Sequence, residues 1–332
     1  MAEIVLVGGS SHSPYLFGDI EMWEECRRAR PISPDVPQES AEVNQAKLQR
    51  CRDAFDTLRQ KVEEVKPDVL LIFGDDQQEQ FDFSLFPAFG MYLGEEVTGS
   101  HPELNYAPRI LLRKQPEEQI FIRAPGHPQL GKALMENLMD RGFDIAFSLD
   151  KHKKERGVGH AFMNPAFYIT PELDIPILPF WVNCYYPPQP KAKRCYELGR
   201  AVREAIEALP LDLRVAVFAS GGLWHTPGVP DAVLNEEFDR AIVKGLRSGN
   251  AREMAEFFDN FPWDYGTAPA RGQERAWTGM SGGVGNGTGE TRNWIVAAAV
   301  ADGRPATWVE YVPVYASPCG MAFAYWDMNG SN

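Results

Sequence analysis

The sequence has few cysteines, and their distribution excludes a disulfide framework. The five cysteines form no CxxC pair and are odd in number. Single cysteines scattered along a chain are typical of proteins from a reducing compartment, whereas small secreted domains carry dense, paired cysteines. We therefore expect reduced thiols and a cytoplasmic protein.

Long hydrophobic runs and an excess of positive charge are also lacking. The longest apolar runs, such as WIVAAAVA at 294–301, span eight residues, whereas a membrane helix needs about 20. The formal net charge of −13 argues against a nucleic-acid partner and against binding to an anionic membrane. The opening residues, MAEIVLVGG, contain no basic region, so we expect no signal peptide.

The hydrophobic residues that are present follow strand and helix patterns in turn, which predicts an α/β fold. Ile4–Val7 is a β-branched run that ends at Gly8. Apolar residues between Leu48 and Val65 recur at three- and four-residue spacing, as on the buried face of a helix. Val69–Phe73 is the next strand. This strand–helix–strand order predicts that the first two strands are parallel neighbours.

The same alternation continues over the rest of the 332 residues. Further strands are expected at 143–147, 175–182, 213–219 and 307–316. Further helices are expected at 130–138, 191–208, 231–247, 250–258 and 290–301. No fixed period recurs, which argues against a repeat architecture. We predict a single catalytic α/β domain over 1–332, with long loops at about 19–44, 84–127 and 264–289.

Polar residues follow three of the expected strands. His12 follows the first strand, Asp75–Glu79 follows the second, and His225 follows the strand at 213–219. Ligands of open α/β sheets bind beyond the carboxyl ends of the strands, so these residues would meet in one crevice if the strands share a parallel sheet. A simpler alternative stays open, because loop histidines and turn aspartates are common in any α/β protein.

The remaining histidines and one glutamate differ in their surroundings. His160 in GVGHAF and His225 in SGGLWHTPG are both flanked by glycines, which present a side chain on a tightly turned backbone. Glu290 lies near the start of an expected helix, where the helix dipole by itself favours a carboxylate. The apolar residues after it indicate a buried helix, so Glu290 is expected to face inward. Three other histidines, expected at the surface, are His101, His127 and His152.

Five short strings occur in an order that resembles a known family. They are SSHSP at 10–14, FGDDQ at 73–77, GHAF at 159–162, SGGLWHTPG at 220–228 and GETRNWIVAAA at 289–299. Together they resemble the markers of the class III extradiol ring-cleavage dioxygenases, the relatives of the protocatechuate 4,5-dioxygenase catalytic subunit. None of the strings is diagnostic alone, but the ordered set covers nearly the whole chain.

The resemblance implies a fold, a metal and residue roles. The fold would be a single α/β domain with a central mixed, partly parallel sheet flanked by helices. Such enzymes hold non-haem Fe(II) with two histidines and a glutamate and leave open positions on the metal. By resemblance, His12 is the first histidine ligand, Glu290 is the glutamate, His225 is the acid–base histidine, and His160 is a second pocket histidine.

The chain departs from the family pattern at the second histidine ligand. That histidine follows an aspartate and precedes a phenylalanine by four residues, and here Gln77 stands in its place between Asp76 and Phe81. Three outcomes stay open. Gln77 binds the metal through its amide oxygen, or Asp76 or Glu79 replaces it and shifts the preference among Fe(II), Mn(II) and Mg(II). In the third outcome the metal is lost and the pocket serves another purpose.

The sequence thus predicts a metal-dependent dioxygenase that cleaves a small catechol-type or aminophenol-type ring with O₂. Fe(II) is the expected metal, with Mn(II) or another divalent ion as the alternative. Two other readings stay open: a metal-dependent hydrolase that activates water, and a non-enzymatic scaffold with an eroded site. The segments 19–44 and 84–127 could cover the site, so we expect a self-sufficient homo-oligomer without a separate small subunit.

Overall fold

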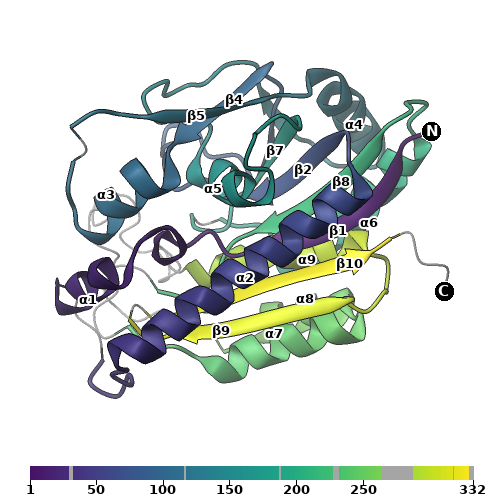
Figure 1. Ribbon diagram of the computed structural model, residues 1–332. Helices are drawn as coiled ribbons and strands as arrows, with labels where there is room; N and C mark the ends of the chain where they lie inside the picture. Colours follow the sequence, from purple (N-terminus) through teal and green to yellow (C-terminus); the bar gives the residue numbers. More distant parts are fainter. Residues whose placement is uncertain are drawn as a thin grey trace.

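The computed structural model describes residues 1–29, 33–115, 117–186, 188–226, 232–262, 287–316 and 318–328. Within these residues, an eight-stranded mixed sheet has the order β6-β3-β7-β2-β8-β1-β10-β9, and β4 pairs with β5 in a separate ribbon (Figure 1). The strands are β1 (Glu3–Ser10), β2 (Val69–Gly74), β3 (Phe89–Tyr92), β4 (Glu96–Ser100), β5 (Phe121–Pro125), β6 (Ala146–Ser148), β7 (Ile177–Val182), β8 (Arg214–Ser220), β9 (Trp308–Val314) and β10 (Cys319–Asp327).

Helices cover both faces of the large sheet. They are α1 (Ile20–Ala29), α2 (Ala41–Val65), α3 (Ala107–Leu111), α4 (Pro128–Asp140), α5 (His160–Ile169), α6 (Ala192–Ala208), α7 (Glu236–Ser248), α8 (Ala251–Asn260) and α9 (Thr291–Val300). Three short turns of helix are η1 (Pro14–Phe17), η2 (Pro102–Tyr106) and η3 (Gly287–Glu290). None of the described helices combines the length and the apolar content that a membrane crossing requires.

The centre of the sheet is parallel and is joined to both flanks by antiparallel pairs. The pairs β1–β8, β8–β2 and β2–β7 are parallel. The pairs β1–β10, β10–β9 and β3–β7 are antiparallel, and the edge pair β3–β6 is parallel. The single α/β domain with a mixed, partly parallel sheet, predicted from the sequence, is therefore confirmed. The prediction that the first two strands are neighbours is wrong, because β8 lies between β1 and β2. A helical crossover fixes the direction of the next strand but leaves room for a third, apolar strand between the two.

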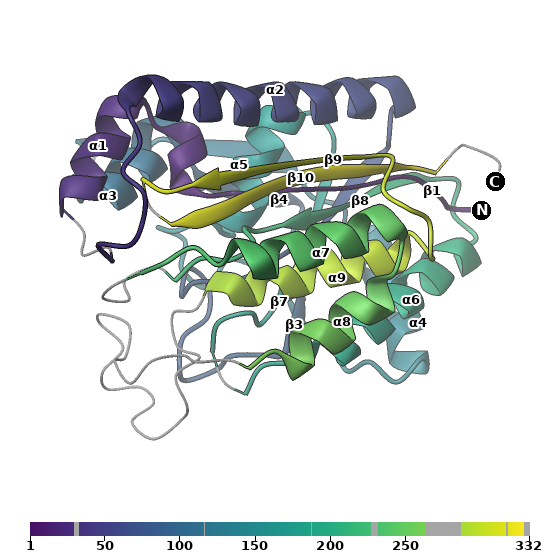
Figure 2. The same ribbon diagram turned by 90° about the horizontal axis from the view of Figure 1, so that it is seen from below.

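Two hydrophobic cores fill the space between the sheet and its helices. Figure 2 shows α1, α2, α3 and α5 on one side of the sheet and α4, α6, α7, α8 and α9 on the other. Along β2, Leu70 and Ile72 belong to the core under α2, and Leu71 and Phe73 to the opposite core. A central parallel strand is buried on both faces, which explains why VLLIFG is apolar throughout.

The segments that we expected as loops contain regular elements. Residues 20–29 form α1, whose Trp23 and Cys26 are buried at a three-residue spacing while acidic and basic residues surround them. The segment 84–127 contains β3, η2, α3 and the β4–β5 ribbon. The loop expected at 264–289 lies outside the described residues, apart from 287–289. The five cysteines are buried and none of them forms a disulfide, as the sequence predicted.

Candidate functional site

Four parallel strands end at the same edge of the sheet and deliver polar side chains there. His12 follows β1, Asp75 follows β2, Tyr185 follows β7 and His225 follows β8. Glu290 ends η3, directly before α9, which packs against β1, β2 and β8. The carboxyl edge of a parallel sheet is the usual ligand site of an open α/β fold.

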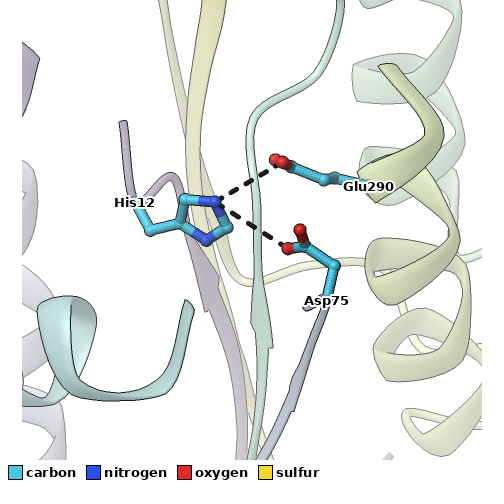
Figure 3. Close-up of side chains that lie close together, drawn as sticks. All are labelled: His12, Asp75 and Glu290. Atoms are coloured by element: carbon cyan, nitrogen blue, oxygen red, sulfur yellow. Dashed lines mark ion pairs between the residues drawn. The ribbon is translucent and has the colours of Figure 1, made fainter. Parts of the chain in front are cut away.

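His12, Asp75 and Glu290 form a buried cluster of metal-binding type. Their side chains point toward one another (Figure 3), and one ligand atom from each lies within 4.8 Å of the other two. The His12 Nε2 atom lies 3.5 Å from Glu290 Oε1 and 3.9 Å from Asp75 Oδ1. Asp75 and Glu290 have no exposed surface and His12 is 3% exposed.

The hydrogen-bond partner of His12 on β8 shows which ring nitrogen donates. His12 Nδ1 lies 2.8 Å from the Ser220 hydroxyl oxygen, and that hydroxyl also contacts the Ala161 carbonyl. The carbonyl can only accept, so the single hydroxyl hydrogen goes to it and His12 Nδ1 donates to Ser220. In the neutral ring Nε2 then carries the lone pair and faces the two carboxylates, the arrangement in which an imidazole binds a metal.

Asp75 is the residue of the cluster that most needs a cation. Neither of its carboxylate oxygens has a hydrogen-bond partner among the described residues. Burial, and then the nearby charge of Glu290, raise the pKa of Asp75 above its usual range. A buried carboxylate without a partner is costly, and a bound divalent ion would compensate both carboxylates. The residues present therefore fit a metal.

Glu290 is held in place as an anion. Its Oε2 accepts from the Gly222 backbone N–H at 2.7 Å, and its Oε1 accepts from the Tyr185 hydroxyl at 2.8 Å. Burial opposes ionisation, but the adjacent rings of His12 and His225 hold the pKa of Glu290 well below its usual range. Gly221 allows this approach, because its φ is +150° and a Cβ there would lie 2.6 Å from the Glu290 Cβ.

His225 lies beside the cluster with one ring nitrogen directed to it. Its Nδ1 is 2.9 Å from the Leu223 carbonyl, which only accepts, so Nδ1 carries a hydrogen. Its Nε2 lies 3.4 Å from Glu290 Oε1, and the side chain is 16% exposed. The Thr288 backbone N–H donates to the His225 carbonyl, and the Thr288 hydroxyl oxygen accepts from the His225 backbone N–H. Burial alone would lower the pKa of His225, but the Glu290 carboxylate raises it.

His160 and Glu79 form a second buried pair against the cluster. His160 Nδ1 lies 2.7 Å from Glu79 Oε2, and the His160 backbone N–H donates to Glu79 Oε1 at 3.1 Å. Burial opposes the charged ring, but Glu79 raises the pKa of His160 to about 9. The ring centroid lies 4.7 Å from that of His12, and the ring stacks on Tyr106. His160 Nε2 is buried and has no partner among the described residues.

Gln77 and Asp76, two of the candidate ligands, make other contacts. The Gln77 amide nitrogen lies 3.1 Å from the Tyr185 hydroxyl and 3.4 Å from Glu290 Oε1. Asp76 accepts from the backbone N–H groups of Gln80 and Phe81, which closes the loop after β2. The third candidate, Glu79, holds His160 as described above. Asp75, which belonged to the predicted polar cluster but not to the candidate ligands, lies with His12 and Glu290.

The three histidines expected at the surface lie outside the cluster. His101 caps η2 by accepting from the backbone N–H groups of residues 103 and 104. His127 caps α4 by accepting from the Leu130 N–H. His152 is exposed. Their contacts are accounted for by local structure.

Comparison with known proteins identifies the family. A family model described as the catalytic LigB subunit of aromatic ring-opening dioxygenase matches residues 32–323 of the chain. The chain belongs to this family. The class III extradiol resemblance inferred from the five strings is thereby confirmed.

Several proteins that are similar in sequence to this chain are named as ring-cleaving enzymes. A 2,3-dihydroxyphenylpropionate/2,3-dihydroxicinnamic acid 1,2-dioxygenase from Photorhabdus laumondii is 28% identical over 203 residues, 60% of this chain and 57% of that protein. A protein of the same name from Rhodococcus globerulus is 27% identical over 271 residues, 74% and 79% of the two chains. Gallate dioxygenase from Pseudomonas putida is 38% identical over 103 residues, 30% and 29% of the two chains. The match to the first relative thus spans little more than half of its length.

A buried carboxylate outside the cluster of His12, Asp75 and Glu290 anchors the loop that carries His225. Asp239, on α7, accepts from the Trp224 backbone N–H and from the Tyr311 hydroxyl, both at 2.7 Å. It has no exposed surface. Burial raises the pKa of Asp239 to about 7, so the folded protein binds this proton more tightly than the unfolded chain does.

We expect Asp239→Asn to remove part of the pH dependence of stability. Ionisation of Asp239 disfavours the folded state, so the free energy of unfolding falls as the pH rises from about 4 to about 7. Asparagine stays neutral, and its Oδ1 can accept from the Trp224 N–H while its Nδ2 donates to the Tyr311 hydroxyl oxygen. The stability of the variant relative to wild type should therefore increase over this range by up to roughly 4 kcal/mol. Urea unfolding at several pH values measures it, with Asp53→Asn on the exposed face of α2 as the control. A pH-independent difference would contradict the expectation.

Proposed function

We propose that the protein is a metal-dependent dioxygenase that cleaves the ring of a small catechol-type or aminophenol-type substrate with O₂. Membership of the LigB family supports this reaction class. The observation that carries the proposal is the buried cluster of His12, Asp75 and Glu290, with His225 directly beside it.

We propose that His12, Glu290 and Asp75 hold the metal, in place of the ligand set with Gln77 expected from the sequence. Asp75 supplies two unpartnered oxygens within the described residues, whereas Gln77 directs its amide nitrogen to Glu290. Fe(II) is the proposed metal, and Mn(II) or another divalent ion is the alternative, because two carboxylates form a harder ligand set than two imidazoles. When bound, the metal supplies open coordination positions and redox chemistry for an aromatic diol and O₂.

The two pocket histidines supply proton transfer and substrate binding. His225 has Nδ1 committed to the Leu223 carbonyl, so Nε2 is the atom that takes a proton from a substrate hydroxyl and later returns one. A histidine suits both steps near neutral pH. His160, fixed by Glu79, offers Nε2 to a substrate oxygen from the side of His12.

Oxygen consumption tests the proposed reaction. Protein purified without oxygen and loaded with Fe(II) is expected to consume O₂ and form a yellow product with at least one of catechol, protocatechuate, gallate and 2-aminophenol. The same protein treated with a chelator is the control and should be inactive. Absence of bound metal and of oxygen uptake with all four compounds would refute the proposal. Turnover of an ester or amide that persists without O₂ would favour hydrolysis at the same site.

We also propose, from the sequence alone, a cytoplasmic homo-oligomer that works without a separate small subunit. The small aromatic substrate and O₂ would be its partners, with neither nucleic acid nor membrane involved. Light scattering on the purified, active chain tests the assembly. Activity that requires an added second polypeptide would contradict it.

A further inference from the structure

Tyr185 connects three residues of the site through one hydroxyl group. The hydroxyl oxygen lies 2.8 Å from Glu290 Oε1, 3.1 Å from the Gln77 amide nitrogen and 3.4 Å from His225 Nε2. The side chain is 3% exposed. A core tyrosine usually satisfies its hydroxyl with one partner, whereas this hydroxyl reaches a proposed metal ligand, the proposed acid–base histidine and the glutamine that replaces the family's histidine.

The direction of these hydrogen bonds follows from the number of protons available. A phenol has one hydrogen and a carboxylate can only accept, so the Tyr185 hydroxyl donates to Glu290. The Gln77 amide N–H then donates to the hydroxyl oxygen. Bonds to an ionised acceptor are the stronger kind, and this one adds to the Gly222 N–H on the other oxygen of Glu290. The carboxylate is thus held from both sides, with Oε1 directed to His12.

The backbone that carries Tyr185 is fixed on both sides. Before it, Asn183 closes a turn by donating to the Tyr186 carbonyl at 2.6 Å and accepting from the Tyr186 N–H at 2.9 Å. The Cys184 carbonyl packs on Gly289, where an added Cβ would lie 2.1 Å from it. The segment after β7 is therefore locked to the residue before Glu290, and the Tyr185 ring has little freedom to move away.

We propose that Tyr185 is a positioning residue of this site, whose hydroxyl fixes the Glu290 carboxylate for metal binding and accepts a hydrogen bond from His225 Nε2 once that nitrogen has taken a proton. The inference rests on the proposed metal-dependent function. It also gives Gln77 a role: the amide that stands where the family has a histidine ligand supports Glu290 through Tyr185 instead of binding the metal.

Two adjacent tyrosines provide a matched test. Tyr185→Phe removes the hydroxyl and keeps the ring, so the fold should be retained. Tyr186→Phe makes the same change one residue away, at a buried tyrosine whose hydroxyl accepts from Gln78. The metal-free proteins are titrated with Mn(II) alone in a calorimeter. We expect the affinity of Tyr185→Phe for Mn(II) to be about 10- to 100-fold weaker than that of the wild type. Tyr186→Phe should bind as the wild type does.

A kinetic measurement separates positioning from a general structural role. At saturating metal, Tyr185→Phe should lower kcat while KM stays near the wild-type value, because the His225 ring loses its hydrogen-bond acceptor at the step in which Nε2 carries the substrate proton, and the substrate contacts remain. Thermal unfolding of the metal-free variants verifies that both are folded. Equal metal affinity and equal kcat for the two variants would overturn the inference and leave the proposed function intact. Failure of the wild type to bind any divalent metal would instead overturn the proposed function, and this inference with it.

Discussion

His225→Ala is expected to lower the turnover of a catechol-type substrate by about 10²- to 10⁴-fold, the usual contribution of a general acid–base group. His225 Nε2 lies 3.4 Å from Glu290 Oε1, next to the proposed metal position, and the side chain is partly exposed toward the site. The His12, Asp75 and Glu290 side chains remain in this variant, so the bound metal measured by atomic emission should stay close to the wild-type content.

The exposed His152 provides the control for this experiment. His152→Ala removes an imidazole far along the chain from the cluster residues and should leave both turnover and metal content unchanged. If His225→Ala loses the metal together with activity, His225 is a metal ligand and the proposed acid–base role is wrong. Full activity of His225→Ala would remove it from the mechanism.

Asp75→Asn is expected to weaken metal binding by more than about 100-fold, the upper range for loss of an outer-shell partner. The substitution keeps the size of the side chain and removes the charge that would face the cation. Without metal, the same variant should be more stable than wild type by about 1 to 3 kcal/mol, because a buried carboxylate with no partner among the described residues has been neutralised. Metal titration and urea unfolding measure the two effects.

Two neighbours distinguish Asp75 from the ligands that the sequence suggested. Gln77→Ala should weaken metal binding by no more than about tenfold, as loss of a supporting contact to Glu290 and Tyr185 would. Asp76→Asn changes the same functional group one residue away, in a carboxylate already bonded to two backbone N–H groups, and should retain the metal. If Gln77→Ala abolishes binding and Asp75→Asn does not, the amide oxygen of Gln77 is the ligand.

The elements that the sequence predicted best are those whose buried residues follow a regular local pattern, either at helical spacing or as a continuous apolar run. The regular spacing from Leu48 to Val65 marked α2, and the apolar run Val69–Phe73 marked β2, because each depends on local periodicity. Segment 20–29 was missed because it is rich in acids and buries only Trp23 and Cys26. Strand order was also missed, since pairing β8 between β1 and β2 depends on all strands of the sheet.

The candidate site shows the same division. His12, His225 and Glu290 could be named from short strings, because the two histidines follow predicted strands, Glu290 stands at the start of a predicted helix, and all three stand in a family-like context. Asp75 and Tyr185 could not. An aspartate after a strand is an ordinary turn residue in sequence, and a tyrosine in an apolar segment is an ordinary core residue. Only their distances to Glu290 and His12 distinguish them.

The sequence by itself therefore determined the fold class, the family and the positions of most polar groups along the chain, because those follow from local pattern and composition. The tertiary structure decided which oxygen atoms face His12. That choice depends on where four strand ends meet and on which carboxylates already have backbone partners: Asp76 has two and Asp75 has none among the described residues. The meeting of strand ends that are far apart in sequence, together with the hydrogen bonds that each carboxylate already makes, selects the proposed ligands.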